Sequence, residues 1–538
     1  MRRDLNQLRS HRFDVAVVGG GVHGAWVALR AAQAGLQVAL VERGDFGAAT
    51  SSNSLNILHG GLRYLQHLDF ARMRTSIRAR REFCRMSPAL VRPLQCLMPL
   101  KAAGVRSPWT LGPALLLNDF ISHDRNDGVE AGLRLPRGRL LSAARCRERV
   151  EPLAATDAFG GAIWWDAVTL DPGRLVLETV VAAADSGAAV ANHLQAIEYL
   201  IQGQTVHGIA VRDGISGEEF EIRASVVVNA TGPWAGELSN RSHANVAFLP
   251  PGWVGGLNVV LGRSLGIQTA IALSAASKQA DSSAVLRRAT RELFFVPWRD
   301  VTVVGTDYFP VRDPSEVDGV PASLIERFVA EIATVAPHAR VSPADVAAVQ
   351  WGLLPQEANG TPLPRKAPIL VSGEAETGVH GLVVVIGEKL TSAPTLSVAV
   401  VERAVRELHG RRDNNDGRRQ ASEVTILQSA ARADALDRLG TMRPELQAPL
   451  CAGHEARGGE VVHAIRDEMA LGLEDIVLRR LGLGYVGHPG IDVLRRCARI
   501  AAPEFGWTQA EQESAVAQLD ARLRRWGTDR SEHGSAAA

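Results

Sequence analysis

Apolar positions near the start of the chain predict a strand, a helix and a second strand. Residues 13–18 form a short apolar run, residues 25–34 are rich in alanine, and residues 36–41 form a second apolar run. Gly35 lies where the helix is expected to stop. Because the first strand and the helix are joined by a glycine-rich turn, the pattern predicts a βαβ unit.

Four further segments carry strand or helix patterns. Residues 69–86 place apolar side chains at helical spacing among many arginines, which predicts one amphipathic helix. Residues 187–228 and 256–306 alternate short β-like runs with glycine or polar breaks, and 293–305 predict a hairpin. Residues 381–406 repeat the order of strand, glycine turn and helix, and are expected to pack on the first βαβ unit.

The composition changes beyond residue 410. Residues 411–424 are highly charged with few apolar residues, which indicates an exposed linker. Residues 460–481 and 490–525 show helical spacing, so we expect a small helical domain over 425–530. The last residues, 531–538, are expected to form a disordered tail.

Composition excludes several classes of protein. Among 538 residues, 46% are hydrophobic and 22% charged, as in soluble globular proteins. The balance of 59 basic against 58 acidic residues gives no field that would attract nucleic acid. The five cysteines lack metal-site spacing, so we expect reduced thiols in the cytoplasm and no metal. No apolar run reaches the roughly 18–20 residues needed to span a bilayer, so any membrane contact is expected to be peripheral.

The turn after the first strand has the spacing of a dinucleotide-binding motif. Gly19, Gly21 and Gly24 satisfy G-x-G-x-x-G, in which glycines allow the tight turn, the approach of backbone to pyrophosphate and close helix packing. Glu42 ends the second strand, where a carboxylate accepts hydrogen bonds from ribose hydroxyls. The combination predicts dinucleotide binding but does not separate FAD from NAD.

Further sequence motifs follow the glycine turn along the chain. They are Val41-Glu42-Arg43-Gly44-Asp45-Phe46, Thr50-Ser51-Ser52, His59-Gly60-Gly61-Leu62-Arg63-Tyr64, Val228-Asn229-Ala230-Thr231-Gly232-Pro233-Trp234, Val296-Pro297-Trp298 and Gly387-Glu388-Lys389-Leu390-Thr391. Together they resemble FAD-dependent glycerol-3-phosphate dehydrogenases over residues 12–525. The resemblance implies FAD as cofactor, hydride transfer from a secondary alcohol to flavin N5, and quinone as the electron acceptor.

The resemblance also implies the fold. We expect a mixed α/β protein with a Rossmann-like FAD-binding domain interleaved with a β-rich substrate-binding cap over 12–410, followed by the C-terminal α-helical domain. The FAD-binding parts are expected at 12–100, 155–240 and 350–410, and the cap at 100–155 and 241–350.

Residues that match the family's motifs are expected to contact FAD. Thr50, Ser51 and Ser52 would supply small donors near flavin and pyrophosphate. Backbone amides after Gly387 would face the flavin pyrimidine ring, where they stabilise negative charge on the reduced flavin. The predicted cofactor residues are Gly19, Gly21, Gly24, Glu42, Arg43, Thr50, Ser51, Ser52, Ala230, Gly232, Gly387, Leu390 and Thr391.

The substrate side departs from the family's pattern. Leu354 stands where a phosphate-binding arginine is usual, and Asn56 replaces a basic residue. Asn258 stands at the position of a histidine, and Ala393-Pro394 replaces a tyrosine-arginine pair. The loss of cations weakens a dianion site more than a monoanion site. We therefore expect a changed substrate, such as a hydroxy acid or a modified phosphoester.

Oxidation of a carbinol requires a base for the hydroxyl proton and a cation for the substrate anion. His59 and Lys389 are the candidate catalytic residues, His59 as base and Lys389 chiefly as an anion contact. Arg365, Lys389 and Asn258 are the candidate substrate-binding residues. His59 also fits a turn residue bonded to backbone, and Lys389 fits an ordinary salt bridge.

Three functions stay open from the sequence. The first is a quinone-linked dehydrogenase of glycerol 3-phosphate or an analogue, the second a flavin oxidase or dehydrogenase for another hydroxy or amino acid, and the third a flavin-binding module without turnover. The arginines of residues 72–85 suggest peripheral contact with the inner face of the cell membrane, against the alternative of a solvated helix face.

Overall fold

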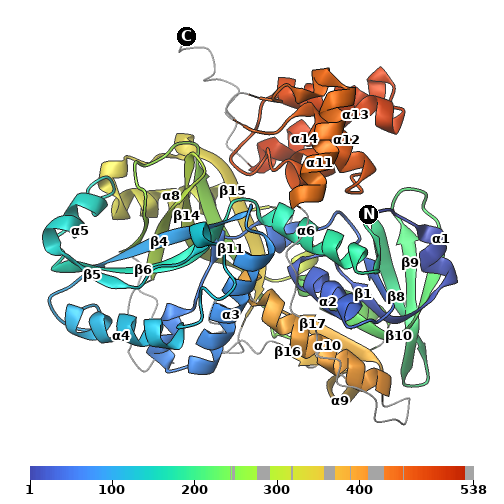
Figure 1. Cartoon of the computed structure of the whole chain (residues 1–538), viewed down its shortest axis with the longest axis horizontal. Helices are drawn as coiled ribbons and strands as arrows, with labels where there is room; N and C mark the ends of the chain where they lie inside the picture. Colours follow the sequence, from blue (N-terminus) through green and yellow to red (C-terminus); the bar gives the residue numbers. More distant parts are fainter. Residues whose placement is uncertain are drawn as a thin grey trace.

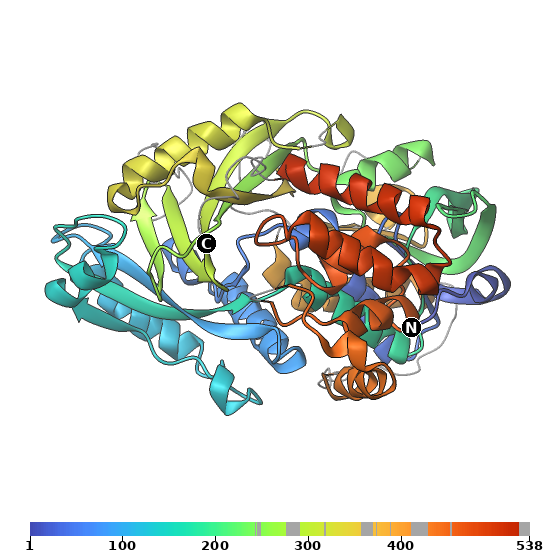
Figure 2. The same cartoon turned by 90° about the horizontal axis from the view of Figure 1, so that it is seen from above.

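The structure, a computed structural model, describes residues 1–242, 244, 249–275, 291–316, 319–356, 370–372, 374–387, 389–409, 429–451 and 454–526. Two parts built on β-sheets lie side by side, and a helical domain covers one of them (Figures 1 and 2). This arrangement confirms the predicted fold class. The predicted linker 411–424 and tail 531–538 lie outside the described residues.

The first sheet carries the predicted βαβ unit at its centre. Its strands run in the order β16-β17-β10-β1-β2-β7, and β10, β1, β2 and β7 are parallel neighbours. The strands are β1 (Arg12–Val18), β2 (Val38–Val41), β7 (Ala189–Ala191), β8 (Leu194–Gln202), β9 (Thr205–Asp213), β10 (Glu219–Asn229), β16 (Leu370–Ser372) and β17 (Leu382–Ile386). Parallel pairing of β17 with β10 confirms that the late strand returns to the first unit.

Helices cover the first sheet because their apolar faces need burial. One face packs against α2 (Val22–Gln33), α6 (Pro172–Asp185) and α10 (Ala393–His409), whose alanines, valines and leucines form one core with strand side chains. The short helices α1 (Leu5–Ser10) and α7 (Ala235–Arg241) lie by the other face, above the β8–β10 meander. The carboxyl ends of β1, β2 and β10 therefore meet at one edge, where ligands bind in such sheets.

The second sheet forms the cap. Its strands run in the order β15-β11-β14-β13-β12-β4-β6-β3, with β5 beside β6. They are β3 (Ile57–Leu58), β4 (Val91–Leu100), β5 (Arg139–Ser142), β6 (Gly160–Thr169), β11 (Trp253–Leu261), β12 (Ala270–Ser274), β13 (Glu292–Trp298), β14 (Val301–Val311) and β15 (Val346–Pro355). The antiparallel pair β13–β14 confirms the predicted hairpin.

Two predicted domain boundaries shift in the structure. Strands β4 and β6 belong to the cap sheet, although the boundaries at residues 100 and 155 assigned them to the FAD-binding parts. Helices α5 (Ala143–Val150) and α8 (Ala322–Val335) pack on the far face of this sheet. Helices α3 (Phe70–Met86) and α4 (Pro108–Ile121) lie on its other side, at the edge of the cap (Figure 1).

The arginines of α3 turn mostly inward. Arg74 and Arg81 bind Asp124, the latter at 2.9 Å, and Arg80 binds the buried Asp166 at 2.6 Å. Of the six arginines between residues 72 and 85, only Arg78 is exposed. The charge of this helix therefore serves internal contacts. Within the described residues, no helix combines the length and apolarity required to cross a membrane.

The C-terminal part is helical, as predicted. It comprises α11 (Ser429–Met442), α12 (Gly458–Arg466), a π-helical turn (Asp475–Arg480), α13 (Ile491–Phe505) and α14 (Gln509–Trp526). Their apolar side chains form a separate core. The domain lies over α6 and the first sheet (Figure 1).

Buried charges join this domain to the first sheet. Asp45, which follows β2, accepts hydrogen bonds from Arg479 Nε at 2.5 Å and from Arg480 Nη2 at 2.9 Å. Arg479 also binds Asp475 at 2.8 Å, and the second oxygen of Asp475 meets His193 at 2.9 Å. Burial opposes the charge of Arg479, but Asp45 and Asp475 hold its pKa well above the ordinary value. The cluster fixes the helical domain to the loop after β2.

Candidate active site

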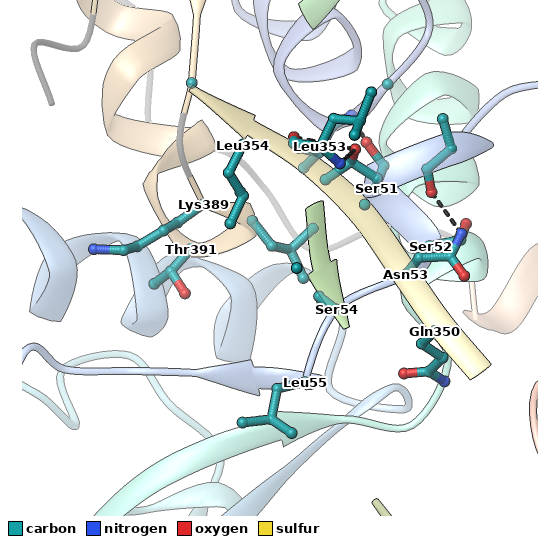
Figure 3. A pocket seen from close by; sticks show the side chains of 18 of the residues that line it. Ser51, Ser52, Asn53, Ser54, Leu55, Gln350, Leu353, Leu354, Lys389 and Thr391 are labelled. Atoms are coloured by element: carbon teal, nitrogen blue, oxygen red, sulfur yellow. Dashed lines mark hydrogen bonds between the residues drawn. The ribbon is translucent and has the colours of Figure 1, made fainter. Parts of the chain in front are cut away.

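A cavity of about 1400 Å³ runs from the glycine turn after β1 to the inner face of the cap sheet. Its wall includes the ends of β1 and β2, the segment 48–65, the carboxyl half of β15 and the turn after β17. Figure 3 shows part of this wall, with Leu353 on β15 beside Ser51 and Leu354 on the side of Lys389 and Thr391. The cavity thus brings the predicted cofactor residues other than Gly24 together with His59, Asn258 and Lys389.

The glycine turn leaves no room for side chains. Gly19 has φ of 104°, and a Cβ there would lie 2.7 Å from the carbonyl oxygen of Ala230 at the end of β10. A Cβ on Gly24 would lie 1.8 Å from the carbonyl oxygen of Gly19. Helix α2 therefore begins against the strand, and its first amides lie at the cavity, where they attract phosphate.

Glu42 lies at the end of β2 with its carboxylate held by backbone. Oε2 accepts the N–H of Gly20 at 2.7 Å, and Oε1 accepts that of Gly44 at 2.9 Å. Burial raises the pKa of Glu42, whereas the two N–H groups oppose this rise. Each carboxylate oxygen keeps acceptor capacity for a ribose hydroxyl. Beside it, the Arg43 guanidinium stacks 4.2 Å from the centre of the Trp234 ring, and both line the cavity.

The turn Ala49–Ser52 places three hydroxyls against different partners. Thr50 Oγ1 accepts the N–H of Leu353 at 3.0 Å, which ties the turn to β15. Ser51 Oγ accepts the N–H of Val22 at 3.0 Å, at the start of α2. Ser52 is buried and donates to the carbonyl of Gly47. Thr50 and Ser51 line the cavity and tie the turn to β15 and α2, whereas the hydroxyl of Ser52 closes its own loop.

The turn after β17 meets the segment after β3. Gly387 lies so close to His23 that a Cβ would be 1.8 Å from His23 Nε2. Leu390 and Thr391 begin a 3-10 turn, and Thr391 Oγ1 accepts a hydrogen bond from the backbone N–H of His59 at 3.4 Å. The predicted flavin-facing turn and the predicted base therefore share one wall of the cavity.

His59 is neutral at ordinary pH. Burial and then the positive charge of Lys389, followed by nearby arginines, lower the pKa of His59 to about 3. Its Nε2 has no hydrogen-bond partner among the described residues. The ring packs edge-on to Tyr64, with centroids 6.1 Å apart. The neutral imidazole nitrogen can accept a hydrogen bond, whereas the burial and the nearby positive charges oppose its protonation.

Lys389 and an arginine of α3 both contact Tyr64. Lys389 Nζ donates to Tyr64 Oη at 2.7 Å, and Nζ also lies 5.0 Å from the ring centre. The Arg72 guanidinium lies 5.0 Å from the same ring centre. Sequence reasoning missed Tyr64 and Arg72, although Tyr64 belongs to the tract after His59. Arg365, the other predicted cation, lies outside the described residues.

Neutral amides occupy the positions where the family's basic residues were expected. Asn258 on β11 is buried, lines the cavity and accepts a hydrogen bond from Thr306 Oγ1 at 2.8 Å. Asn56 is buried and reaches Gln350 on β15 at 3.5 Å. Leu354 lines the same cavity as Lys389 (Figure 3). Three of the four predicted departures therefore lie at or beside one cavity.

The fit to FAD follows from these groups. At Gly19 and Gly24 a Cβ would strike backbone, so the close packing there needs glycine and leaves the amides of the turn at the cavity. Glu42 lines the cavity where a ribose would lie. His23 Nδ1 and Gln350 Nε2 are buried at the wall without hydrogen-bond partners among the described residues. Buried polar atoms require partners, so the wall is built for a ligand with many polar groups. A dinucleotide has that chemistry.

Comparison with known families gives the class and then the family. Residues 14–403 match the FAD dependent oxidoreductases, and residues 420–512 match the C-terminal domain of alpha-glycerophosphate oxidase. Glycerol-3-phosphate dehydrogenase 2 of Mycobacterium bovis is 30% identical, over 96% of this chain and 89% of the relative. The glycerol-3-phosphate dehydrogenase of Synechocystis is 27% identical, over 96% and 97%. The chain belongs to the FAD-dependent glycerol-3-phosphate dehydrogenase family, and FAD is its cofactor.

Solved structures agree on the fold. The glycerol-3-phosphate dehydrogenase from Bacillus halodurans in complex with FAD superposes with a TM-score of 0.69 at 20% identity, covering 97% of this chain and 96% of the other. The L-alpha-glycerophosphate oxidase from Mycoplasma pneumoniae, with FAD bound, gives 0.54 at 15% identity, covering 78% and 99%. At these sequence identities of 15–20%, the structural similarity supports a common fold and nothing more.

Proposed function

We propose that this protein oxidises a secondary alcohol that carries an anionic group, glycerol 3-phosphate or an analogue, and passes the electrons to quinone. The observation that carries the proposal is the meeting of a neutral histidine and a lysine at the turn after β17. The backbone N–H of His59 donates to Thr391 Oγ1, and Lys389 lies two residues before Thr391. FAD, when bound, supplies the hydride acceptor.

The chain's own residues then have separate roles. Lys389, with the Tyr64 hydroxyl beside it, holds the substrate anion. His59 accepts the hydroxyl proton when the bound substrate anion offsets the positive charge of Lys389, which otherwise opposes protonation of the ring. Loss of this proton lets the alcohol release a hydride. The helix start at Gly21 and the carboxylate of Glu42 bind the pyrophosphate and the ribose. The cap sheet excludes water through the buried strands β11 and β15.

A second candidate, the oxidation of another hydroxy or amino acid, is favoured by a different observation. Leu354 brings an apolar side chain, and Asn258 a neutral one, to positions where the family's pattern has charge. A carboxylate needs fewer cations than a phosphate dianion. Relatives' names suit the first candidate, whereas these two side chains suit the second.

Anaerobic reduction of the bound flavin separates the candidates. The purified yellow protein is mixed with glycerol 3-phosphate, and the oxidised flavin absorbance is followed. Bleaching supports the first candidate. A stable spectrum with glycerol 3-phosphate and bleaching with a 2-hydroxy or amino acid supports the second. If no alcohol or amine bleaches the flavin, the protein does not turn over and the proposal fails.

The pH dependence tests His59 as the base. Because the pKa of His59 is about 3, its neutral, proton-accepting form is already present at pH 5. We expect the second-order rate constant of flavin reduction to stay level from pH 5 to 8 and to fall only in more acidic solution. His59→Asn should lower this constant by roughly 10²- to 10⁴-fold. Stopped-flow absorbance measures it.

The variant Lys389→Met gives a second test of His59 as the base. It removes a charge that helps to depress the pKa of His59, so the acid limb of the profile should move toward higher pH. An acid limb near the ordinary histidine pKa of about 6.5 in the wild type, or an unchanged limb in Lys389→Met, would count against this assignment.

Peripheral membrane contact suits a quinone acceptor, and α4 supports it better than the arginines of α3. Trp109, Leu116 and Phe120 follow one side of α4 and are 83%, 73% and 77% exposed. Large apolar side chains in such a cluster mark an interaction surface. Figure 1 shows α4 at the outer edge of the cap.

Vesicle binding tests this surface. We expect the protein to sediment with vesicles that contain anionic lipid. The double change Trp109→Ser with Phe120→Ser should weaken binding by roughly 100-fold, at about tenfold for each large apolar side chain withdrawn. Ile215→Ser, which alters an equally exposed side chain (63%) in the β9–β10 turn, should not change it. Equal binding by all three proteins would exclude α4 as the contact.

A further inference from the structure

The cap side of the cavity has an apolar part, here called the apolar chamber. Its wall is formed by Leu62, Met98, Leu111, Leu115, Trp164 and Phe294. These side chains come from the turn after β3, from β4, β6 and β13, and from the inner side of α4. Trp164 packs edge-on to Phe294, with centroids 6.4 Å apart. The chamber is continuous with the space at Lys389 and Thr391.

The polar groups beside the chamber are already engaged. Trp164 Nε1 donates to Asp166 Oδ2 at 3.0 Å, so the indole offers its carbon surface to the chamber. Asp166 Oδ1 accepts from Arg80 at 2.6 Å and from the N–H of Gly60 at 2.6 Å. Arg106 and Glu292, at the rim, form an ion pair with each other. A ligand group in the chamber therefore meets apolar surface.

The opposite end of the substrate space is cationic. Lys389 lies there with Tyr64, and Arg63 lines the same cavity with its positive charge near His59. Leu354 and Asn258 line the wall without charge. This end therefore suits an anionic group. Helix α4 carries apolar side chains on two sides. Leu111 and Leu115 line the chamber, while Leu116 and Phe120 face solvent.

We infer that the substrate is an amphiphile, a secondary alcohol with an anionic group at Lys389 and an apolar chain or ring in the apolar chamber. This inference rests on the proposed function and names its substrate class. The substrate loses a hydride to FAD and its hydroxyl proton to the base, and becomes a ketone. Quinone then removes the two electrons.

Binding without turnover tests the chamber first. The holoprotein is titrated with n-alkanoates from butanoate to decanoate, below their micellar concentrations, and the perturbation of the flavin spectrum gives each dissociation constant. We expect the constant to fall by about fourfold for each added methylene group. Constants that do not depend on chain length would overturn the inference. Because no oxidation occurs, this result is separate from the fate of the proposed function.

Substrate oxidation gives the second measurement. Anaerobic flavin reduction is compared for glycerol 3-phosphate and for 2-hydroxy acids of growing chain length. Half-saturation at lower concentration for longer chains supports the inference. Reduction by glycerol 3-phosphate with no gain from any chain would overturn it and leave the proposed function standing. Absence of reduction by every alcohol would instead defeat the proposed function.

Filling the chamber should reverse the preference. Ala114 lines the cavity from α4, so Ala114→Phe should lower the ratio of butanoate to octanoate dissociation constants by at least about tenfold. Leu116→Phe, on the solvent side of the same helix, should keep the wild-type ratio. A wild-type ratio in Ala114→Phe overturns the inference. FAD content checks folding, and Ala114→Leu replaces Ala114→Phe if the latter loses FAD.

The chain of a quinone is the competing occupant of the chamber. Reduced protein is therefore reoxidised with quinones that carry or lack an isoprenoid tail. If Ala114→Phe slows only the tailed quinone and leaves the alkanoate ratio unchanged, the chamber holds the acceptor and the inference fails. If the alkanoate ratio changes and both quinones react as in the wild type, the inference stands.

Discussion

Gly24→Ala should yield a colourless protein that does not retain FAD. The added Cβ would lie 1.8 Å from the carbonyl oxygen of Gly19, and neither atom belongs to a flexible side chain. Helix α2 would have to move away from β1, and its amides would leave the phosphate position. We expect destabilisation by about 3 kcal/mol or more. FAD binding should weaken by well over tenfold, because each lost charge-assisted hydrogen bond is worth about 1.5–3 kcal/mol.

Two further glycine-to-alanine variants serve as comparisons for Gly24→Ala. Gly21→Ala brings a Cβ to 3.0 Å from Ser51 Oγ, which can rotate, so it should fold as the wild type but weaken FAD binding, because this glycine lets the backbone approach the pyrophosphate. Gly132→Ala meets nothing within 4 Å and should behave as wild type. The bound FAD per chain and the dissociation constant from flavin fluorescence measure all three. A yellow Gly24→Ala protein with wild-type affinity would refute the described geometry.

Asp45→Asn should detach the helical domain from the first sheet. The carboxylate is fully buried and pairs with Arg479 and Arg480. Its loss leaves Arg480 without a carboxylate partner among the described residues, whereas Arg479 keeps that of Asp475. Breaking such a cluster costs about 3–5 kcal/mol. We expect a lower urea midpoint for the apo protein and faster FAD release, because the same loop carries Glu42. Urea unfolding followed by tryptophan fluorescence gives the midpoint.

Asp492→Asn is the matched control. Asp492 makes the same type of contact with Arg495 at 3.6 Å, but its side chain is 94% exposed. Exposed pairs contribute about 0–1 kcal/mol. The midpoint of Asp492→Asn should therefore equal that of the wild type. If both variants unfold alike, the buried cluster does not hold the domains together.

The cofactor half was predictable because its signals are local. The glycine spacing, Gly35 and Glu42 fall within one βαβ unit, and each has a stereochemical reason to be where it is. The geometry of Gly19 and Gly24 agrees with that reasoning. The return of β17 to β10 was also predictable, because its strand, turn and helix repeat the pattern of the first unit.

The substrate half was less predictable because its contacts join distant residues. The arginines of α3 look solvated in the sequence, but Arg74 and Arg80 find Asp124 and Asp166 far along the chain. Periodicity alone cannot reveal such pairs. The boundaries at residues 100 and 155 failed for a related reason, since β4 and β6 pair with each other across that interval. Asp45 likewise meets Arg480 only in the folded protein.

The discontinuous first sheet also bears on synthesis of the protein. Strands β1 and β2 leave the ribosome early, whereas β17, with the turn that follows it, is translated hundreds of residues later. At roughly 5–20 residues per second, the nascent chain exposes an incomplete, apolar sheet for tens of seconds. FAD capture is therefore a late, nearly post-translational event, and chaperone demand should be highest while the cap is being made.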